Sequence, residues 1–529
     1  MAHQQSMSLD GIEQLEGLGA WSEALTSLQG LLLGPQSSLP QGYHLLGRLY
    51  QRLGRNAQAR RAYQQALALQ PHSPRTYNNL ALLELAELKA AAADAWLQQG
   101  LQIPECCADD RTLLYATGCE LRLFQLRIFE AFSYAQAHLA LSVSVVSLTN
   151  AASCLHQLAR FDEARQLQQQ AVALHLQDHA PQLLQQPLAA LVGAPCGDRQ
   201  ATDRLRTLLL NLGIVLLCLD PFDPQGQSLL LAHDATDRVQ HQPIGGSWQP
   251  WNGERCQRLT LWDDQGFGDT LQNLGWVHDA AERAEQLELW LRPSLLPLVR
   301  SRFRLPAHCI LNVMTPDARP WAQGGSHLGL YHLPMVLGAW TVAQKPDHLR
   351  GWLRQTSRPR SLPPRIGLVW SAGRHPAPQP ERSARLRDAP FPEFWALAQQ
   401  WRQCYGAEIF SLQLDAQSAT AAQQAFSSGA MIQGVQSTDW LETAAVLESL
   451  DAVVSVDTSL AHLAGVLGVP CCLLLPAPAD WRWGQGGHQT WLYPSLALVR
   501  CQEPRNWSAV WPQLADWMDC QLGHQLQKR

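Results

Sequence analysis

The residues of this chain best suited to do chemistry are Asp457, Thr458 and Ser459, which join an apolar strand to an apolar helix. The mostly β-branched run 453–456 predicts a buried parallel strand, and apolar residues recur at helical spacing over 460–467. Backbone N–H groups at such a strand-to-helix turn suit a phosphate or pyrophosphate, because the positive end of the helix dipole lies behind them. The alternative interpretation is that Asp457 and Thr458 only cap the helix.

The glycine-rich loop 266–269 (GFGD) is of the same kind, since it follows the apolar run 259–264 and precedes another helical pattern. Its glycines let the backbone approach a ligand closely, and the carboxylate of Asp269 is able to take a proton from a reacting hydroxyl. A tight turn capped by Asp269 is the alternative interpretation. Two such loops at matching places in successive α/β units predict a cleft, with Asp269 on one wall and Asp457 on the other.

Both loops lie in a region where strands and helices are expected to alternate, which implies a parallel sheet in each of two halves. Tryptophan, glycine and proline become frequent from His241, and a proline-bearing connection at 359–364 separates the halves. Helices are expected to begin near Phe391, Ala416, Trp440 and Thr458. The expected strands are 259–264, 287–291, 310–313, 366–370, 408–412, 452–456, 471–475 and 496–499.

The N-terminal part repeats a pattern of small and large residues with a period of about 34 residues. Over 43–71, small residues recur where two helices would cross, and large ones where they would fill the groove between helices. The pattern returns over 77–100 and 148–171, in degenerate form over 19–24, and a last helix pair is expected over 203–238. This pattern is typical of tetratricopeptide repeats, which bind a peptide or partner in their concave face or position an attached domain.

The composition excludes several classes of function. The net charge of −5 argues against a nucleic-acid binder. The 13 cysteines are an odd number without a C-x-x-C, which fits neither a disulfide framework nor a structural zinc site and favours a reducing, cytoplasmic setting. The N-terminus lacks a signal pattern, and the longest apolar run, 208–219, falls short of the ~20 residues that span a bilayer. No transmembrane segment is expected.

Six blocks of this sequence, taken in order, resemble tetratricopeptide proteins with a heptosyltransferase-like glycosyltransferase domain of the GT-B class. The resemblance covers nearly the whole chain and extends, more distantly, to the O-linked N-acetylglucosamine transferases. It implies a TPR-like helical repeat array followed by a GT-B type pair of Rossmann-like domains. The six blocks are 251–254 (WNGE), 265–272 (QGFGDTLQ), 365–371 (RIGLVWS), 411–413 (SLQ), 456–465 (VDTSLAHLAG) and 480–483 (DWRW).

The resemblance implies transfer of a sugar from a nucleotide-sugar donor. It makes Asp269 the favoured catalytic base, and places Asp457, Thr458 and His462 at the donor. His462 is alternatively a core histidine, since it lies on a helix face. No D-x-D motif occurs in the expected cleft, so neither a metal nor another cofactor is expected. The residues predicted to bind the donor are Gly266, Gly268, Thr270, Arg374, Arg387, Asp457, Thr458, Ser459 and His462.

The chain departs from the simpler heptosyltransferases in its cations. Those enzymes place a lysine in the second half to meet the phosphates, whereas residues 346–527 contain no lysine, and Arg374 is expected to substitute. Asp388 follows Arg387 and puts an acidic group near the expected phosphates. A solvated basic loop is the alternative to a phosphate site. The arginines of this loop are Arg374, Arg382, Arg385 and Arg387.

The sequence therefore predicts a cytoplasmic, metal-independent, inverting glycosyltransferase that acts on a hydroxyl of a protein or glycan acceptor recruited by the repeat array. The predicted domains are the array (1–240), an acceptor-side half (241–358) and a donor-side half (359–529). The alternative function is a scaffold protein whose transferase domain is degenerate and not catalytic. A lipopolysaccharide-core heptosyltransferase is a further alternative, disfavoured because that acceptor needs no repeat array.

Overall fold

The computed structural model divides into two compact units, Met1–Cys154 with His375–Ser383, and Leu155–Arg374 with Ala384–Arg529. The predicted domain boundaries after residues 240 and 358 both lie outside the described residues, and the compact units part earlier, after Cys154. No helix among the described residues is long and apolar enough to cross a bilayer. The structure describes residues 8–34, 38–231, 248–315, 325–338, 349–353, 363–374, 376–414 and 422–526.

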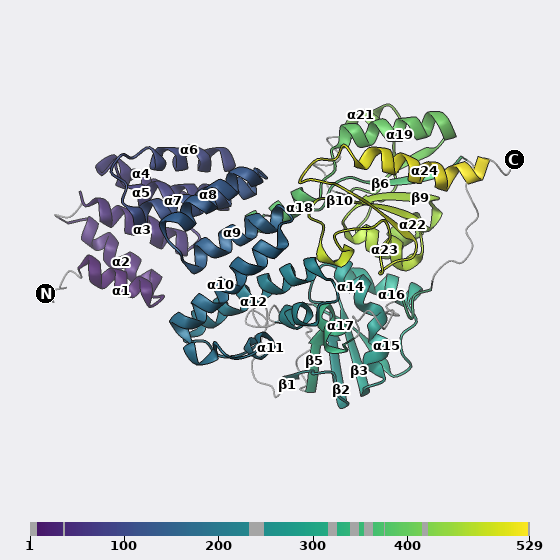
Figure 1. Cartoon of the computed structure of the whole chain (residues 1–529), viewed down its shortest axis with the longest axis horizontal. Coiled ribbons are helices and arrows are strands. Elements are labelled where there is room, and N and C mark those ends of the chain that lie inside the picture. The colour runs from purple at the N-terminus through teal and green to yellow at the C-terminus, as the bar shows by residue number, and fades with distance from the viewer. Residues whose placement is uncertain are drawn as a thin grey trace. The chain divides into compact units, whose positions relative to one another are not determined.

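The first unit is built from pairs of helices, each pair packed on the next (Figure 1). Its pairs are α1 (Leu9–Gly17) with α2 (Trp21–Leu32), α3 (Pro40–Arg52) with α4 (Asn56–Leu69), α5 (Pro74–Ala86) with α6 (Ala90–Leu101), and α7 (Ala108–Phe124) with α8 (Ile128–Leu141). Helix α9 (Val145–Gln157) crosses into the second unit. The predicted repeat array is confirmed, because a helix pair occupies each stretch where the pattern of small and large residues recurs.

The turns inside the helix pairs share one backbone geometry. Gly19, Gly54, Leu88, Leu126 and Ala159 all have positive φ, between 57° and 78°. In each turn the following N–H donates to a carbonyl five residues back, as Arg55 does to Tyr50 at 2.8 Å. A residue other than glycine in this conformation costs about 1–2 kcal/mol, so the packing of the helices must hold these turns in place.

The pair α7 and α8 was not predicted from the sequence, although a signal for it exists. A Cβ on Gly118 would lie 2.7 Å from the ring of Tyr134, and a Cβ on Gly47 would overlap the ring of Tyr63 in the same way. Both glycines therefore let a tyrosine of the second helix pack directly on the backbone of the first. The two glycine–tyrosine pairs have the same separation along the chain, which is the regularity that identifies the additional repeat.

The second unit contains two parallel sheets. In the first sheet the strand order is β1-β5-β2-β3-β4, and in the second it is β11-β10-β9-β6-β7-β8. All pairings between these strands are parallel. The first sheet comprises β1 (Trp248–Pro250), β2 (Cys256–Trp262), β3 (Ala284–Leu291), β4 (Cys309–Val313) and β5 (Gly325–Gly329). The second comprises β6 (Arg365–Val369), β7 (Glu408–Ser411), β8 (Ile432–Gln433), β9 (Ala452–Val456), β10 (Cys471–Leu475) and β11 (Leu496–Arg500).

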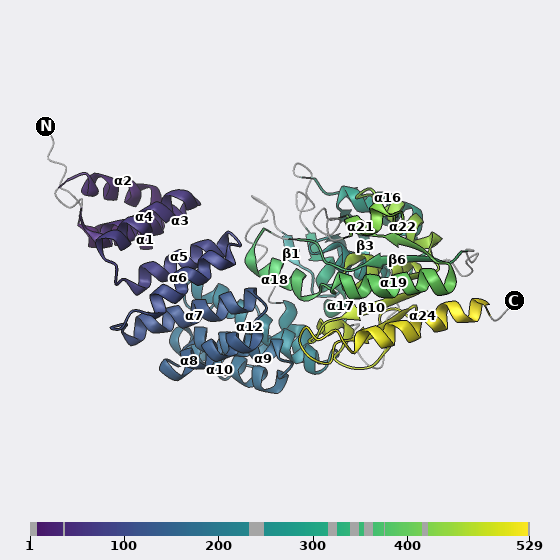
Figure 2. The same ribbon diagram turned by 90° about the horizontal axis from the view of Figure 1, so that it is seen from above.

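Helices cover both faces of the second sheet. Helices α19 and α24 lie along one face and α22 and α23 along the other (Figure 1), and α24 runs beside α19 in both views (Figure 2). Every residue of β9 and β10 is buried, as expected for strands covered on both faces. These helices are α19 (Phe391–Tyr405), α22 (Trp440–Ser449), α23 (Ser459–Leu467) and α24 (Val510–Leu526).

Some of the remaining helices of the second unit continue the helical array, and the others connect the strands of the two sheets. Helix α12 packs against α10 and against the 3-10 turn η6 (Trp481–Trp483), so the end of the array forms one body with the α/β region. The predicted helix near Ala416 lies outside the described residues. These helices are α10 (Phe161–His179), α11 (Leu188–Leu191), α12 (Arg199–Leu219), a helix over 224–231, α14 (Phe267–Asn273), α15 (Val277–Ala281), α16 (Leu296–Arg302), α17 (Leu333–Val336) and α21 (Gln423–Ser427), while α18 (Pro378–Leu386) crosses the two units.

The predicted fold class is confirmed: a TPR-like helical array precedes a GT-B type pair of Rossmann-like domains. Each of the eight expected strands is present, with its ends shifted by no more than a few residues. The strands that sequence reasoning missed are β1, β5 and β8. Two of them are very short, since β1 has three residues and β8 has two.

Candidate active site

A pocket of about 490 Å³ lies at the carboxyl ends of the strands of the second sheet. Open α/β sheets bind ligands at this edge. Phe267 and Ser294 of the first half complete its wall, so both halves of the second unit contribute to it. No lining residue among those described is ionisable. The lining residues are Phe267, Ser294, Val369, Ser371, Gly373, Leu412, Gln413, Leu414, Val435, Ser437, Thr438, Trp440, Thr443, Thr458, Ser459 and Leu460.

The loop after β9 supplies one end of this pocket. Thr458 is the N-cap of α23 in extended backbone geometry, and it lines the pocket together with Ser459 and Leu460. Within the described ranges, the N–H groups of these three residues donate no hydrogen bond. The Thr458 side chain does not cap the helix and instead meets the Ser455 hydroxyl at 3.3 Å. The free N–H groups and the positive end of the helix dipole thus face a cavity.

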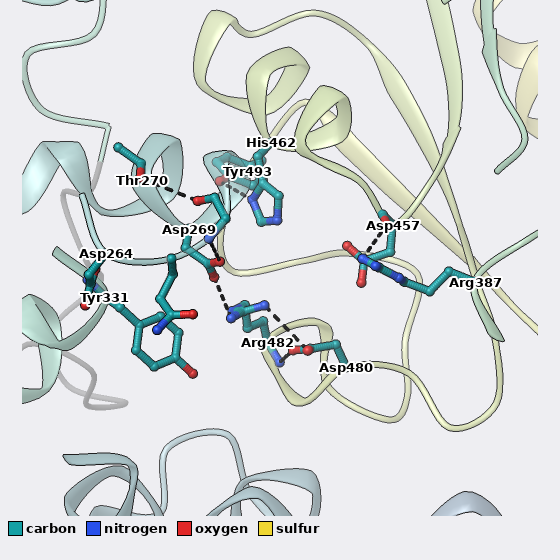
Figure 3. A network of polar contacts seen from close by, with 12 residues as sticks. Asp264, Asp269, Thr270, Tyr331, Arg387, Asp457, His462, Asp480, Arg482 and Tyr493 are labelled. Carbon is teal, nitrogen blue, oxygen red and sulfur yellow. Dashed lines mark hydrogen bonds and ion pairs between the residues drawn. The ribbon is translucent and has the colours of Figure 1, made fainter. Parts of the chain in front are cut away.

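Asp457 precedes these groups and is only 7% exposed. Burial raises the pKa of its carboxyl, although the charge of Arg387 opposes that effect. The Arg387 guanidinium donates from Nη1 to the Asp457 backbone carbonyl at 3.0 Å (Figure 3). Arg387 therefore supports the backbone of the loop at the start of α23.

The glycine-rich loop begins helix α14 on the opposite wall. The Asp269 carboxylate accepts from the N–H of Gly266 at 3.1 Å through Oδ2, which closes the first turn of the helix. The Thr270 hydroxyl is buried and donates to the Gly266 carbonyl at 3.4 Å. Gly266 and Thr270 thus shape the loop that carries Asp269, and the Thr270 hydroxyl is engaged within the helix.

The two predicted loops come together in the structure. A Cβ on Gly268 would lie 2.8 Å from Cδ2 of His462, so only glycine fits between α14 and α23. The Asp269 carboxylate faces the second half and accepts from Nη2 of Arg482 at 2.6 Å through Oδ1 (Figure 3). The helix that carries Asp269 therefore packs directly against α23.

His462 is held in a fixed orientation on the buried face of α23. Its Nδ1 lies 2.8 Å from the hydroxyl of Tyr493, and its ring packs against Trp483 with the ring centroids 5.1 Å apart. A Cβ on Gly465 would overlap the Tyr493 ring, so that glycine makes room for the tyrosine. The side chain of His462 is directed toward the loop of Gly268 on the other wall.

The arginines of the basic loop contact different groups and belong to different compact units. Arg374 forms an ion pair with Asp388 at 2.8 Å, and the other carboxylate oxygen of Asp388 accepts from the N–H of Ala372. Asp388 thus neutralises Arg374 and fixes the turn after β6. Arg382 belongs to the first compact unit, whereas Arg385 and Arg387 belong to the second.

Sequence reasoning missed two ionisable residues beside Asp269. Arg482 appeared only within the DWRW block, with no role assigned to it. Asp264 lies in the loop between β2 and α14, and it accepts from the N–H of Tyr331 at 3.1 Å. Burial raises the pKa of Asp264 to about 7, and the nearby charge of Asp269 adds to the effect. A Cβ on Gly329 would overlap this carboxylate, so the position of Asp264 depends on that glycine.

The raised pKa of Asp264 predicts a fall in stability with rising pH. Its pKa in the folded protein exceeds the ordinary value of 3.8, so the stabilisation is present below about pH 4 and is lost as pH rises through 7. We expect Asp264→Asn to flatten the decrease in melting temperature between pH 5 and 8, as measured by differential scanning fluorimetry. Glu282→Gln, at an exposed ion pair, is the matched control. An unchanged slope in the Asp264 variant would contradict the prediction.

Within the described ranges, no group of three or more histidine, cysteine, aspartate or glutamate side chains is arranged to hold a metal ion. The polar side chains around the two loops form hydrogen bonds and ion pairs with one another and with the backbone (Figure 3). What the cleft offers a ligand is an uncharged pocket, a helix N-terminus and a carboxylate.

Comparison with protein-family models identifies one repeat of the helical array. Residues 40–73 match the family model of the tetratricopeptide repeat. They form a tetratricopeptide repeat. This match confirms the repeat predicted over 43–71. No curated protein matches the chain in sequence.

Solved structures of two kinds are similar to parts of this chain. The E. coli heptosyltransferase WaaC with ADP-2-deoxy-2-fluoro heptose is 14% identical, with 50% of this chain and 100% of that chain covered and a TM-score of 0.34. The E. coli ADP-heptose lps heptosyltransferase II is 11% identical, with 51% and 99% covered and a TM-score of 0.36. Pseudomonas aeruginosa pilF is 16% identical, with 41% and 93% covered and a TM-score of 0.29.

Proposed function

We propose that this protein is a glycosyltransferase that moves a sugar from a nucleotide-sugar donor to a hydroxyl of a protein or glycan acceptor. One observation carries the proposal: the unbonded N–H groups at the start of α23 face an uncharged pocket, and the Asp269 carboxylate lies on α14, which packs against α23 and contributes Phe267 to the same pocket. A nucleotide sugar presents a base, a diphosphate and an anomeric carbon in that order. The pocket, the helix N-terminus and the carboxylate suit these three groups in turn.

The base end of the donor is assigned to the aromatic side of the pocket. Phe267 and Trp440 line it with their ring centroids 5.0 Å apart, one ring from each half. An aromatic wall favours a planar base, and the hydroxyls of Ser371, Ser437 and Thr438 offer hydrogen bonds to its edge or to the ribose. This arrangement brings the diphosphate to Thr458 and Ser459.

The proposed reaction is a single displacement. The acceptor oxygen forms a bond to the anomeric carbon, and the bond from that carbon to the phosphate oxygen breaks. The acceptor proton passes to Asp269, and the electron pair of the broken bond leaves with the nucleoside diphosphate. The N–H groups of Thr458, Ser459 and Leu460 stabilise the charge that grows on the leaving group. A base on one wall and a leaving group on the other favour inversion at the anomeric carbon, without a metal or other cofactor.

We propose that the helical array recruits the acceptor through a pocket of about 530 Å³ in the first unit. Arg48 and Arg52 lie one helical turn apart on α3 and give this pocket a positive charge. Arg48 forms an ion pair with Glu16 at 2.7 Å, whereas the side chain of Arg52 is exposed. Burial, together with the charges of Arg48 and Arg75, lowers the pKa of the adjacent His44 to about 4, as expected in a positive field. The pocket therefore suits an acidic peptide. Its lining residues are Trp21, Arg48, Gln51, Arg52, Tyr63 and Asn79.

Reversal of one charge tests this recruitment site. We expect Arg52→Glu to weaken binding of fluorescein-labelled, glutamate-rich peptides by about tenfold, measured by fluorescence anisotropy, because ~1.4 kcal/mol is within the reach of one charge at a partly exposed site. Arg55→Glu is the matched control, since Arg55 is exposed on the same helix pair but does not line the pocket. Equal losses in the two variants, or tighter binding of lysine-rich peptides, would contradict an acidic partner.

A scaffold with a non-catalytic transferase domain is the second candidate function. The pairing of Arg374 with Asp388 and of Asp269 with Arg482 favours it, because both groups are already engaged. A thermal-shift screen with ADP-, UDP- and GDP-linked sugars separates the two functions. Donor present at 100 times its Kd should stabilise the native state by about 2.7 kcal/mol. A scaffold would show no shift with any of these sugars.

A further inference from the structure

Arg482 contacts the carboxylate of the opposite half. It lies in η6 of the second half, and its Nη2 is 2.6 Å from Oδ1 of Asp269 in the first half. Its Nη1 is 3.5 Å from Oδ2 of Asp480, and its backbone N–H donates to Oδ1 of the same aspartate at 3.0 Å. Only 16% of the arginine side chain is exposed. Arg482 is thus fixed by Asp480 and is directed at Asp269 (Figure 3).

Aromatic side chains of both halves surround this arginine. The guanidinium carbon lies 5.7 Å from the ring centroid of Tyr331, which is in the first half, and 5.6 Å from that of Trp481. Helix α12 packs against the turn that carries Arg482. These contacts restrict the arginine to few conformations, because a planar guanidinium between rings has little room to rotate.

The Asp269 carboxylate is consequently held at both oxygens. Oδ2 accepts from Gly266 of its own loop at 3.1 Å, and Oδ1 accepts from Arg482 at 2.6 Å. Two donors from different directions fix the plane of the carboxylate. A carboxylate has about four lone-pair sites, so each oxygen keeps one for an incoming hydroxyl. The bond from Gly266 alone would leave the carboxylate free to turn about it.

We propose that Arg482 is a positioning residue for Asp269, which holds the base in its reactive orientation only while the two halves are together. This inference rests on the proposed function. It gives the Asp480-Trp481-Arg482 segment a role: Asp480 orients the arginine, and the arginine orients the base. An orientation that depends on the opposite half also disfavours hydrolysis of the donor in an open cleft, since the base is completed only on closure.

A second arginine pair between the halves provides a matched control. Arg302 of α16 meets Glu448 of α22 through two hydrogen bonds, of 3.0 and 2.9 Å, and neither residue lines the pocket. Loss of either arginine removes one partly buried ion pair between the same two halves. If Arg482 only joins the halves, Arg482→Met and Arg302→Met should have the same effect.

The experiment uses the full chain and whichever of the ADP-, UDP- or GDP-linked sugars stabilises it, with release of the nucleoside diphosphate as the readout. We expect Arg482→Met to lower kcat by about 10- to 100-fold with an unchanged donor KM, as for loss of orientation. Arg482→Lys should restore part of that loss, and Arg302→Met should leave kcat unchanged. In an Asp269→Asn background, adding Arg482→Met should lower kcat no further, because the two residues act as one unit.

The outcomes distinguish a failure of the positioning role of Arg482 from a failure of the proposed glycosyltransferase function. Equal losses in Arg482→Met and Arg302→Met would overturn the positioning role in an active enzyme. A raised donor KM with an unchanged kcat would also overturn it, and would make Arg482 a donor contact. A further loss in the double variant would show that the arginine acts independently of Asp269 and would overturn the inference as well. If the wild-type chain turned over none of the sugars, the proposed function would fail first. If Arg482→Met does not fold, Arg482→Lys with the Asp269→Asn double variant gives the same test.

Discussion

Replacing Asp269 with asparagine is expected to lower sugar transfer by about 10²–10⁴-fold, the usual contribution of a positioned general base. The amide is nearly isosteric with the carboxylate but is not able to take the proton of the acceptor hydroxyl. Donor binding should persist, because Asp269 does not line the pocket assigned to the nucleotide. The measurement is the rate of nucleoside diphosphate release, together with the thermal shift that the same nucleotide sugar produces.

The structure also predicts a modest loss of stability in this variant. Asp269 accepts two hydrogen bonds, one at each oxygen, and an asparagine side chain has only one oxygen. Loss of the bond from Gly266 removes a helix cap, which costs about 1 kcal/mol. Glu282→Gln, which neutralises an exposed carboxylate of the same half, is the control for charge alone. Turnover at the wild-type rate in Asp269→Asn would remove this residue as the base.

The sequence predicted the parallel sheets well because their strands carry an unambiguous pattern. The runs 452–456 and 471–475 are apolar except for Ser455, and every residue in them is buried. Strand β5 was missed because its sequence, GSHLG, holds two glycines and no β-branched residue. Short strands of this kind are defined by their neighbours in the sheet rather than by their own composition.

The candidate site was predictable only as far as local motifs extend. Both loops are motifs of a few residues, so the sequence alone was enough to propose Asp269 and Thr458. The contact between Asp269 and Arg482 joins residues 213 positions apart and depends on how two sheets pack against each other. Similarly, α12 has an ordinary helical pattern, and only its packing against η6 places it in the body of the α/β region. Contacts of this kind, between elements that are distant in the chain, leave no periodic signal in the sequence.

A carboxylate introduced at residue 459 is expected to affect stability and donor binding in opposite directions. Ser459 is the first residue of α23 and lines the pocket. In Ser459→Asp, the new charge interacts favourably with the helix dipole, which adds about 0.3–1 kcal/mol to stability. The same charge repels a diphosphate a few ångströms away by a few kcal/mol, so donor affinity should fall by about 100-fold or more.

Because stability and donor affinity are expected to change in opposite directions, a loss of donor binding in Ser459→Asp would not be explained by damage to the fold. The melting temperature without ligand should be equal to or above that of the wild type, while the shift produced by the nucleotide sugar disappears. Ser459→Ala is the control, because it removes the hydroxyl without adding charge and should keep most of the shift. A full ligand-induced shift in Ser459→Asp would place the diphosphate elsewhere. It would also remove the start of α23 from the proposed site, because no anion held by those N–H groups could tolerate a carboxylate beside them.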